Sequence, residues 1–322
     1  MTRGGSPIAR LAGGPGWARG SEQSPPTARY YGENRSGNAG GSRGVAPPGL
    51  TRVPPGLKRA RRLTKRAFRE RERAFLAEGP QAVAEALRCG APVTDLFVTV
   101  AARSRHVGLV TAAEDAGVPV HVVSGEVMGD LAQTVTPQGL LAVCGFVDVP
   151  LAAVTQPAPL LVTLLANVRD PGNAGTVLRT ADAAGTQAVV FADASVDPYN
   201  GKCVRASAGS LFHVPVVAGV RLDEAVAAMR GAGLRILAAD GRAGRSLDDP
   251  DVQARLGEPT AWMFGNEAWG LPPDLVALAD EPVAVPIYGQ AESLNLAAAA
   301  AVCLYASARA QRVHSVTGQG GT

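Results

Sequence analysis

The chain alternates strand-like and helix-like patterns in two stretches, residues 57–147 and 160–312. In the first stretch, short continuous apolar runs indicate strands, and apolar residues three or four positions apart indicate helices. A strand end, a turn and a helix are expected within 75–90, strands at 95–100, 118–124 and 139–147, and helices at 107–117 and 125–132. This alternation predicts a small α/β domain.

The second stretch repeats the alternation on a larger scale. Strands are expected at 160–165, 188–192, 214–217, 234–240, 261–265 and 282–286, and helices at 174–184, 201–208, 222–231, 272–279 and 293–312. Strands that are apolar almost throughout predict a parallel sheet covered on both faces. Ligands of such sheets bind beyond the carboxyl ends of the strands, which selects the loops after Leu165, Phe264 and Pro286.

The segments around these two domains have a different composition. Residues 1–56 are rich in Gly, Pro, Ser and Arg without apolar periodicity, so we expect a disordered leader, with a transit peptide or a start-site artefact as alternatives. Residues 57–73 are densely basic, which indicates either a solvated helix face or a surface that touches phosphates. The prolines of 148–159 indicate a linker, and 313–322 are expected to form a flexible tail.

Composition narrows the function classes only a little. The 322 residues are 46% hydrophobic and carry a net charge of +3, which is compatible with RNA binding without implying it. The four cysteines are scattered, form no CxxC pair and have no histidine close to them in the sequence. This pattern predicts no metal site and a reduced, cytoplasmic protein. The most apolar helical run, 296–308, is too short to span a bilayer, and no secretory signal is recognisable.

Polar residues concentrate at the first selected loop and the start of the following helix, DPGNAGTVLRTADAAG at 170–185. Asn173 follows Pro-Gly and is expected to cap that helix. An ion pair between Arg179 and Asp182, one turn apart, would explain the arginine structurally. Capping leaves the other amide and guanidinium groups of the loop without a role, which favours a functional site.

The other two loops carry similar clusters. FGNEAWGL at 264–271 follows a strand, and its glycines permit close backbone approach, although Glu267 could also cap the next helix. In VPIYGQAESLNLAAAAA at 285–301, Ser293 is a good helix cap and Asn295 lies in the first turn. The alanine run that follows has high helix propensity and thin side chains, which suit close packing.

These three segments, in this order and at these strand ends, resemble the three signature motifs of the SpoU (TrmH) family of RNA 2′-O-ribose methyltransferases. The segment VDPYNGKCVRASAGSLFHVPV at 196–216 resembles the family's intervening region, and residues 66–147 resemble, more loosely, its small ribosomal-protein-like RNA-binding domain. The resemblance implies an α/β fold of the SPOUT type, with a Rossmann-like parallel sheet and a C-terminal trefoil knot. It also implies a homodimer, S-adenosylmethionine as cofactor and RNA as substrate.

Mapped by motif, the resemblance assigns roles to residues of this chain. Arg179 matches the family's catalytic arginine, and the polar network that would surround it comprises Asn173, Glu267, Ser293 and Asn295. Gly265, Ile287 and Leu296 would line the cofactor pocket, while Arg205 and Ser207 are weaker candidates for RNA contacts. The chain departs from the family pattern at Ala174 and at Ala268-Trp269, which leaves the choice of substrate open.

Two other function classes remain as alternatives. A non-catalytic RNA-binding or ribosome-assembly protein on the same scaffold would not need the polar network. A nicotinamide-dependent enzyme would need a glycine-rich phosphate loop, which the first strand of the second domain lacks. Within the methyltransferase interpretation, the additional amino-terminal domain favours ribosomal RNA over tRNA, by analogy only.

Overall fold

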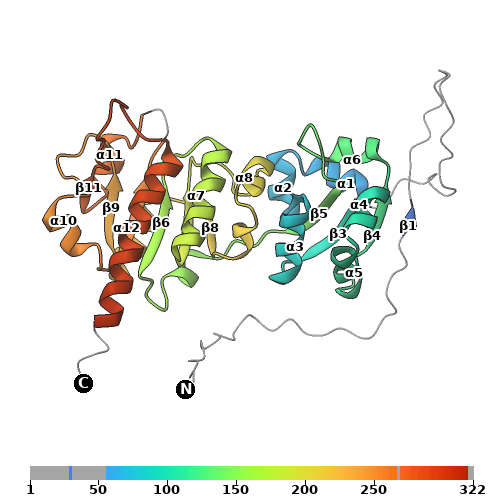
Figure 1. The fold of residues 1–322 in the computed structure, drawn as a ribbon, viewed down its shortest axis with the longest axis horizontal. Helices are drawn as coiled ribbons and strands as arrows, with labels where there is room; N and C mark the ends of the chain where they lie inside the picture. The colour runs from blue at the N-terminus through green and yellow to red at the C-terminus, as the bar shows by residue number, and fades with distance from the viewer. Residues whose placement is uncertain (1–28, 31–55, 267–268, 318–322) are drawn as a thin grey trace, which may run out of the picture.

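The computed structural model describes residues 29–30, 56–266 and 269–317, arranged as two α/β units lying end to end (Figure 1). The predicted leader, residues 1–56, falls almost entirely outside this description. Of the leader, Arg29–Tyr30 form a short strand, β1, that pairs with β4 (Val120–Val123) of the first unit. Among the described residues, no helix is both long enough and apolar enough to cross a membrane.

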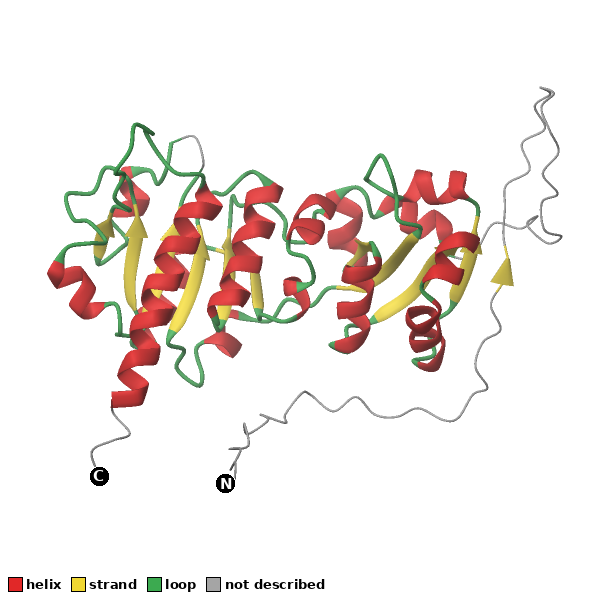
Figure 2. Cartoon of the chain, viewed as in Figure 1, coloured by secondary structure: helices red, strands yellow, loops and turns green. Residues whose placement is uncertain are grey.

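The second unit is built on a six-stranded sheet whose strands are all parallel (Figure 2). In spatial order the strands are β11 (Glu281–Val283), β9 (Arg235–Ala239), β10 (Thr260–Phe264), β6 (Leu161–Leu165), β7 (Ala188–Ala192) and β8 (Val216–Val220). The central strands β6, β7 and β10 are buried along their whole length. The parallel, doubly covered sheet predicted from the apolar runs is thus confirmed.

The helices of this unit follow the predicted pattern, with three differences. They are α7 (Pro171–Ala184), α8 (Gly201–Ala206), α9 (Leu222–Gly231), α10 (Pro250–Arg255), α11 (Pro273–Val276) and α12 (Leu296–Thr317). Helix α7 begins three residues earlier than expected, because Asp170 caps it. Helix α10 was not predicted, although a proline at its first position after Asp249 is a usual helix start. Helix α12 continues to Thr317, so residues 313–317 of the expected flexible tail are helical, and the rest of it lies outside the described residues.

The first unit has a mixed sheet. Strand β5 (Leu140–Gly145) runs antiparallel to both β2 (Ala74–Glu78) and β3 (Val93–Thr99), while β3 and β4 are parallel. Its helices are α1 (Leu57–Arg62), α2 (Arg66–Glu72), α3 (Pro80–Arg88), α4 (Val100–Arg105), α5 (Val107–Asp115) and α6 (Gly125–Leu131). The segment between the units contains one short 3-10 helix, Leu151–Val154. The small α/β domain expected from the sequence is therefore present.

The two units share a continuous apolar core around Tyr199. Its ring stacks on Phe146 with centroids 3.8 Å apart and lies 4.8 Å from Phe75 of β2. The Tyr199 hydroxyl accepts from the backbone N–H groups of Val147 and Asp148 and donates to the Asp148 carboxylate. Burial and this hydrogen bond to the carboxylate raise the pKa of Tyr199 above its usual range. The phenol therefore stays protonated and holds the start of the connecting segment.

A buried ion pair joins the units a short distance away. Arg69 of α2 is 3% exposed, and its Nε and Nη2 donate to Asp197 Oδ2 at 2.9 and 2.7 Å. Its Nη1 donates to the carbonyls of Leu63 and Thr64. The guanidinium is thus satisfied on every side, as a buried charge requires. Part of the basic run 57–73 is therefore structural rather than available to a partner.

Helix α12 covers the middle of the second sheet and lies alongside α7 (Figure 1). The Trp262 indole N–H of β10 donates to Ser307 of this helix at 2.9 Å, and both side chains are buried. The alanine run contributes Ala297 and Ala300 to the core, as its thin side chains predict. Gly289, in the loop before this helix, faces open space.

The Arg69–Asp197 pair can be tested by replacing Arg69 with Met, which keeps the apolar length of the side chain and removes the charge. The free energy of unfolding should fall by about 3–5 kcal/mol, because Asp197 would remain as an uncompensated buried charge. Urea denaturation followed by circular dichroism measures the change. Arg66→Met, which removes an exposed ion pair with Glu70, is the control and should change stability little. Equal stability of the two variants would contradict this account.

Candidate functional site

The carboxyl ends of β6 and β10 bring the three polar loops together, as the topology rule predicts. The two strands are paired so that Leu165 lies opposite Phe264. Just beyond them, the Asn266 side-chain amide donates to the Asn167 carbonyl at 3.3 Å. The Asn295 amide donates to the Asn173 side-chain oxygen at 3.1 Å, across 122 residues of sequence. Loop one is therefore hydrogen-bonded to both of the other loops.

The start of α7 is organised by Asp170 and not, as predicted, by Asn173. The Asp170 carboxylate accepts from the backbone N–H of Asn173 at 2.8 Å and from Lys202 Nζ at 2.6 Å. The hydrogen bond from Lys202 is the main reason why the pKa of Asp170 lies below its usual value. Because Asp170 performs the capping, the Asn173 side chain is left to bond Asn295.

Close backbone contacts shape two of the three loops. A Cβ at Gly175 would lie 2.4 Å from the Cys203 carbonyl of α8, so only glycine lets the two helices approach this closely. A Cβ at Gly265 would lie 2.6 Å from the backbone of Gly270, where Asn266 and Gly270 exchange two backbone hydrogen bonds. Gly270 itself has a φ of 67°, which favours glycine. Loop two is thus a tight backbone turn at a strand end.

A cavity of about 350 Å³ lies among the loops after β9, β10 and β11. It is lined by Ala239, Asp240, Gly241, Arg242, Phe264, Gly265, Asn266, Trp269, Gly270, Val285, Ile287, Glu292, Ser293, Leu294, Leu296 and Ala299. All three residues predicted to hold a cofactor are among them. The cavity combines apolar walls with a few polar groups, which is typical of small-molecule sites.

The third loop ends in a helix cap supplied by Asn295. Its side-chain oxygen accepts from the Ala297 N–H at 2.9 Å, and its carbonyl accepts from Ala299. The prediction that Ser293 caps the helix is therefore wrong, since α12 begins at Leu296, three residues later than expected. Ser293 is instead exposed at the cavity wall, where its hydroxyl can reach a bound molecule.

Arg179 lies on the exposed part of α7 and does not line the cavity. It is six residues beyond Asn173, or about 9 Å along the helix axis. The structural alternative, a pair with Asp182, is not formed, because that carboxylate accepts from His213 Nδ1 at 2.8 Å. Within the described part of the chain, the Arg179 guanidinium has no hydrogen-bond or ion-pair partner. It is therefore available to an external ligand.

The two candidate RNA contacts differ in accessibility. Arg205 donates to Glu78 of β2 at 3.0 Å and remains partly exposed at the boundary between the units. Ser207 is completely buried, and its hydroxyl donates to the Val204 carbonyl. The structure does not support an RNA contact by Ser207, because helix α8 turns its side chain inward. Glu267, the remaining predicted site residue, lies outside the described residues.

The loop after β9 was not among the loops selected from the sequence. Asp240 and Arg242 line the cavity, and the Arg242 guanidinium donates to the Leu271 carbonyl at 2.8 Å. The rule that selected the other loops applies to this strand end too, so Asp240 and Arg242 could have been found from the sequence.

A second hollow of about 500 Å³ lies at the amino ends of β9, β10 and β11, away from all the polar loops.

Two family models match this chain. The SpoU rRNA methylase model covers residues 160–305, and the MRM3-like substrate-binding model covers 55–142. The two matches fall on the two sheets described above. Together they span most of the described residues, and the first includes all three polar loops.

Curated relatives and solved structures agree with these matches. The chain is 35% identical to the 23S rRNA (guanosine(2553)-2′-O)-methyltransferase RlmP of Bacillus subtilis, over 71% of this chain and 86% of that protein. It is 32% identical to the 23S rRNA (guanosine-2′-O-)-methyltransferase RlmB of Bordetella pertussis, over 67% of this chain and 89% of that protein.

Among solved structures, the SpoU methyltransferase AviRb of Streptomyces viridochromogenes in complex with AdoMet superimposes with a TM-score of 0.69 at 28% identity, covering 80% of this chain and 98% of that one. The AdoMet-bound rRNA methyltransferase of Sinorhizobium meliloti superimposes with a TM-score of 0.67 at 29% identity, covering 79% of this chain and 94% of that one. With the polar loops, the cavity and both family models in agreement, the chain belongs to the SpoU rRNA methylase family.

Proposed function

We propose that this protein methylates a ribose 2′-hydroxyl of ribosomal RNA, with S-adenosylmethionine as the methyl donor. The observation that carries the proposal is one cavity at the carboxyl end of a parallel sheet, lined by the second and third polar loops, to both of which the first polar loop is hydrogen-bonded. The relatives named above act on 23S rRNA, which favours ribosomal RNA over tRNA.

The cavity residues fit the cofactor. Val285, Ile287 and Leu296 offer apolar walls for a planar adenine, while Asp240 and Ser293 offer polar groups for ribose and amino-acid moieties. When bound, S-adenosylmethionine supplies a methyl group that is already activated by a sulfonium. The protein therefore needs no covalent nucleophile, and its task is to align the accepting oxygen and stabilise negative charge that develops on it.

We assign to Arg179 the stabilisation of the negative charge that develops on the accepting oxygen. A guanidinium with a pKa above about 12 is a poor general base, but it binds phosphate and oxyanion groups through several N–H donors. Its exposure and its lack of a partner among the described residues leave those donors available. The Asn173–Asn295 hydrogen bond would hold the start of α7 against the cavity loop, and Glu267 completes the proposed polar network.

RNA would be held largely by the first unit. Lys58, Arg62 and Lys65 are exposed cations on α1 and the turn that follows it. Contacts from such residues to phosphates provide affinity without sequence readout. Trp269, 74% exposed at the cavity rim, presents an aromatic face that could stack on an unpaired base.

A homodimer with a trefoil-knotted C-terminal region completes the proposal. Val302 and Tyr305 form an exposed apolar strip one turn long on α12, the helix that packs on α7. All four cysteines are free, which supports a reduced, cytoplasmic location.

The proposed reaction can be tested with tritium-labelled S-adenosylmethionine and either unmodified large-subunit rRNA or total tRNA. Label should enter rRNA at a position that becomes resistant to alkaline cleavage, since alkali needs a free 2′-hydroxyl. Label in tRNA alone would overturn the substrate assignment. Cofactor binding without transfer to either RNA would favour a non-catalytic RNA-binding role.

Replacing Arg179 with Ala should lower the transfer rate at least 100-fold and leave cofactor affinity within a few-fold. The reason is that Arg179 lies outside the cavity and would act on the accepting oxygen or a neighbouring phosphate. Single-turnover transfer and calorimetric cofactor titration measure the two effects. Arg221→Ala, which removes another exposed arginine of the same unit, is the control. A parallel loss of cofactor affinity would instead assign Arg179 to cofactor binding.

Exchanging Lys58 and Lys65 for Gln should weaken RNA binding and lower the slope of log K against log salt by about 1.5, because two phosphate contacts would be lost. Cofactor affinity should not change. The charge-matched control replaces Arg221 and Arg255 with Gln and should leave the slope as in the wild type. An unchanged slope in the lysine variant would show that these residues belong only to a solvated helix face.

Changing Tyr305 to Glu should dissociate the proposed dimer, because a buried carboxylate without a partner is strongly unfavourable. Size-exclusion chromatography with light scattering measures the mass. Val135→Glu, at a fully exposed position of the first unit, is the control and should keep the wild-type mass. A wild-type protein that is monomeric at micromolar concentration would refute the dimer.

A further inference from the structure

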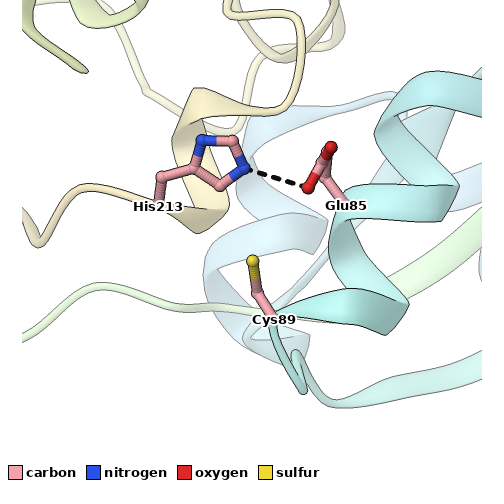
Figure 3. A group of neighbouring side chains, drawn as sticks. All are labelled: Glu85, Cys89 and His213. Carbon is pink, nitrogen blue, oxygen red and sulfur yellow. Dashed lines mark hydrogen bonds and ion pairs between the residues drawn. The ribbon is translucent and has the colours of Figure 1, made fainter. Parts of the chain in front are cut away.

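The boundary between the two units contains a cluster that the methyltransferase site does not use. Glu85 lies on α3, Cys89 follows one turn later as the residue that caps the end of this helix, and His213 of the second unit faces them (Figure 3). One possible ligand atom from each residue lies within 4.8 Å of the other two. Glu85 and His213 are 128 residues apart in sequence, so the sequence analysis, which predicted no metal site, could not see this proximity.

The His213 ring is oriented by a fourth residue. Its Nδ1 lies 2.8 Å from Asp182 Oδ2, while its Nε2 points toward Glu85 Oε2 at 3.0 Å. A carboxylate that holds one ring nitrogen while the other faces a group of ligands is the arrangement found at metal-binding histidines. The orientation of the ring is thus already the one that a metal would require.

A cation from the protein itself occupies the edge of this cluster. Arg88 Nη2 lies 2.6 Å from Glu85 Oε2 and 3.0 Å from His213 Nε2. The Arg88 side chain is 63% exposed, so it can turn into solvent without unfolding any element. The carboxylate and the imidazole therefore already face a positive charge that a metal ion could replace.

We propose that Glu85, Cys89 and His213 bind a zinc ion, with Asp182 as the positioning residue for the imidazole. Thiolate, imidazole and carboxylate are the usual zinc ligands, and tetrahedral coordination places such atoms about 3.3–3.8 Å apart. Glu85 Oε2 and His213 Nε2, now 3.0 Å apart, would move slightly apart, and the Cys89 sulfur, within 4.8 Å of both residues' ligand atoms, would approach by about an ångström at most. Solvent supplies the fourth ligand on the exposed side, where Arg88 now lies.

The position of the site gives it a consequence for the whole molecule. Glu85 and Cys89 belong to the unit proposed to hold RNA, whereas His213 and Asp182 belong to the methyltransferase unit. Asp182 also lies one turn beyond Arg179 on α7. A zinc ion here would fasten the substrate-binding unit to the helix that carries the proposed catalytic arginine. The metal would not take part in methyl transfer.

Cys89 provides a direct readout, because it is exposed and the other three cysteines are buried. The full-length protein, first freed of metal with EDTA, is treated with N-ethylmaleimide at increasing Zn²⁺ concentrations, and mass spectrometry measures labelling of the Cys89 peptide. We expect micromolar Zn²⁺ to slow this labelling at least tenfold. Mg²⁺, which prefers oxygen ligands, should give no protection.

Variants separate the proposed site from incidental thiol binding. Glu85→Gln and His213→Asn should each raise the Zn²⁺ concentration needed for protection at least tenfold, and Asp182→Asn should raise it about tenfold through loss of ring orientation. Arg88→Gln should lower it, because the competing guanidinium is gone. His106→Asn, at a partly exposed histidine elsewhere on the first unit, is the matched control.

Two results would overturn the proposal. One is labelling of Cys89 that stays unchanged up to millimolar Zn²⁺ in both the wild type and Arg88→Gln. The other is protection that His213→Asn and Glu85→Gln leave intact, which would mean that zinc binds the thiol alone. The gain expected for Arg88→Gln keeps the test decisive even if His213→Asn disturbs the packing of the two units. None of these outcomes depends on methyl transfer.

Discussion

The parallel pairing of β6 with β10 is the constraint on which the site depends. Because these strands end side by side, the loops after Leu165 and Phe264 start from neighbouring points, and two asparagine amides suffice to connect all three polar loops. The glycine at the end of β10 lets its loop fold back on itself within five residues. A register shift in this one pair would separate the cavity wall from the start of α7.

The boundary between the two units depends on a different interaction. Tyr199 places an aromatic ring in a shared apolar core and its hydroxyl on the connecting segment, while Arg69 and Asp197 form a buried ion pair beside it. Such a pair stabilises little by itself, but separating its partners leaves a buried charge uncompensated, which is strongly unfavourable. The substrate-binding unit is therefore held in one orientation, which is a condition for presenting RNA to a site on the other unit.

The cavity and Arg179 occupy different parts of the site. The residues proposed to hold the cofactor line a half-open cavity, whereas Arg179 lies outside it on an exposed helix face. The hydrogen bond between Asn295 and Asn173 connects the loop that lines the cavity to the helix that carries Arg179. Such a geometry suits a reaction in which the donor is held in the cavity and the acceptor, a large RNA, approaches from solvent. The Glu85–Cys89–His213 cluster lies at the boundary between the units and, among the described residues, is hydrogen-bonded to α7 only through Asp182. The two sites can therefore be studied separately.

The sequence by itself determined the α/β class, the parallel sheet, most strand positions and the three site loops, because apolar periodicity and strand-end polarity are local signals. It misassigned both helix caps, since Asp170, Asn173, Ser293 and Asn295 are all good capping residues and only tertiary contacts choose among them. It also placed Ser207 at the surface, where the packing of α8 buries it. The family resemblance had already grouped Asn173 with Asn295, but only the tertiary structure brought Cys89 to His213, because chain spacing carries no information about contacts between units.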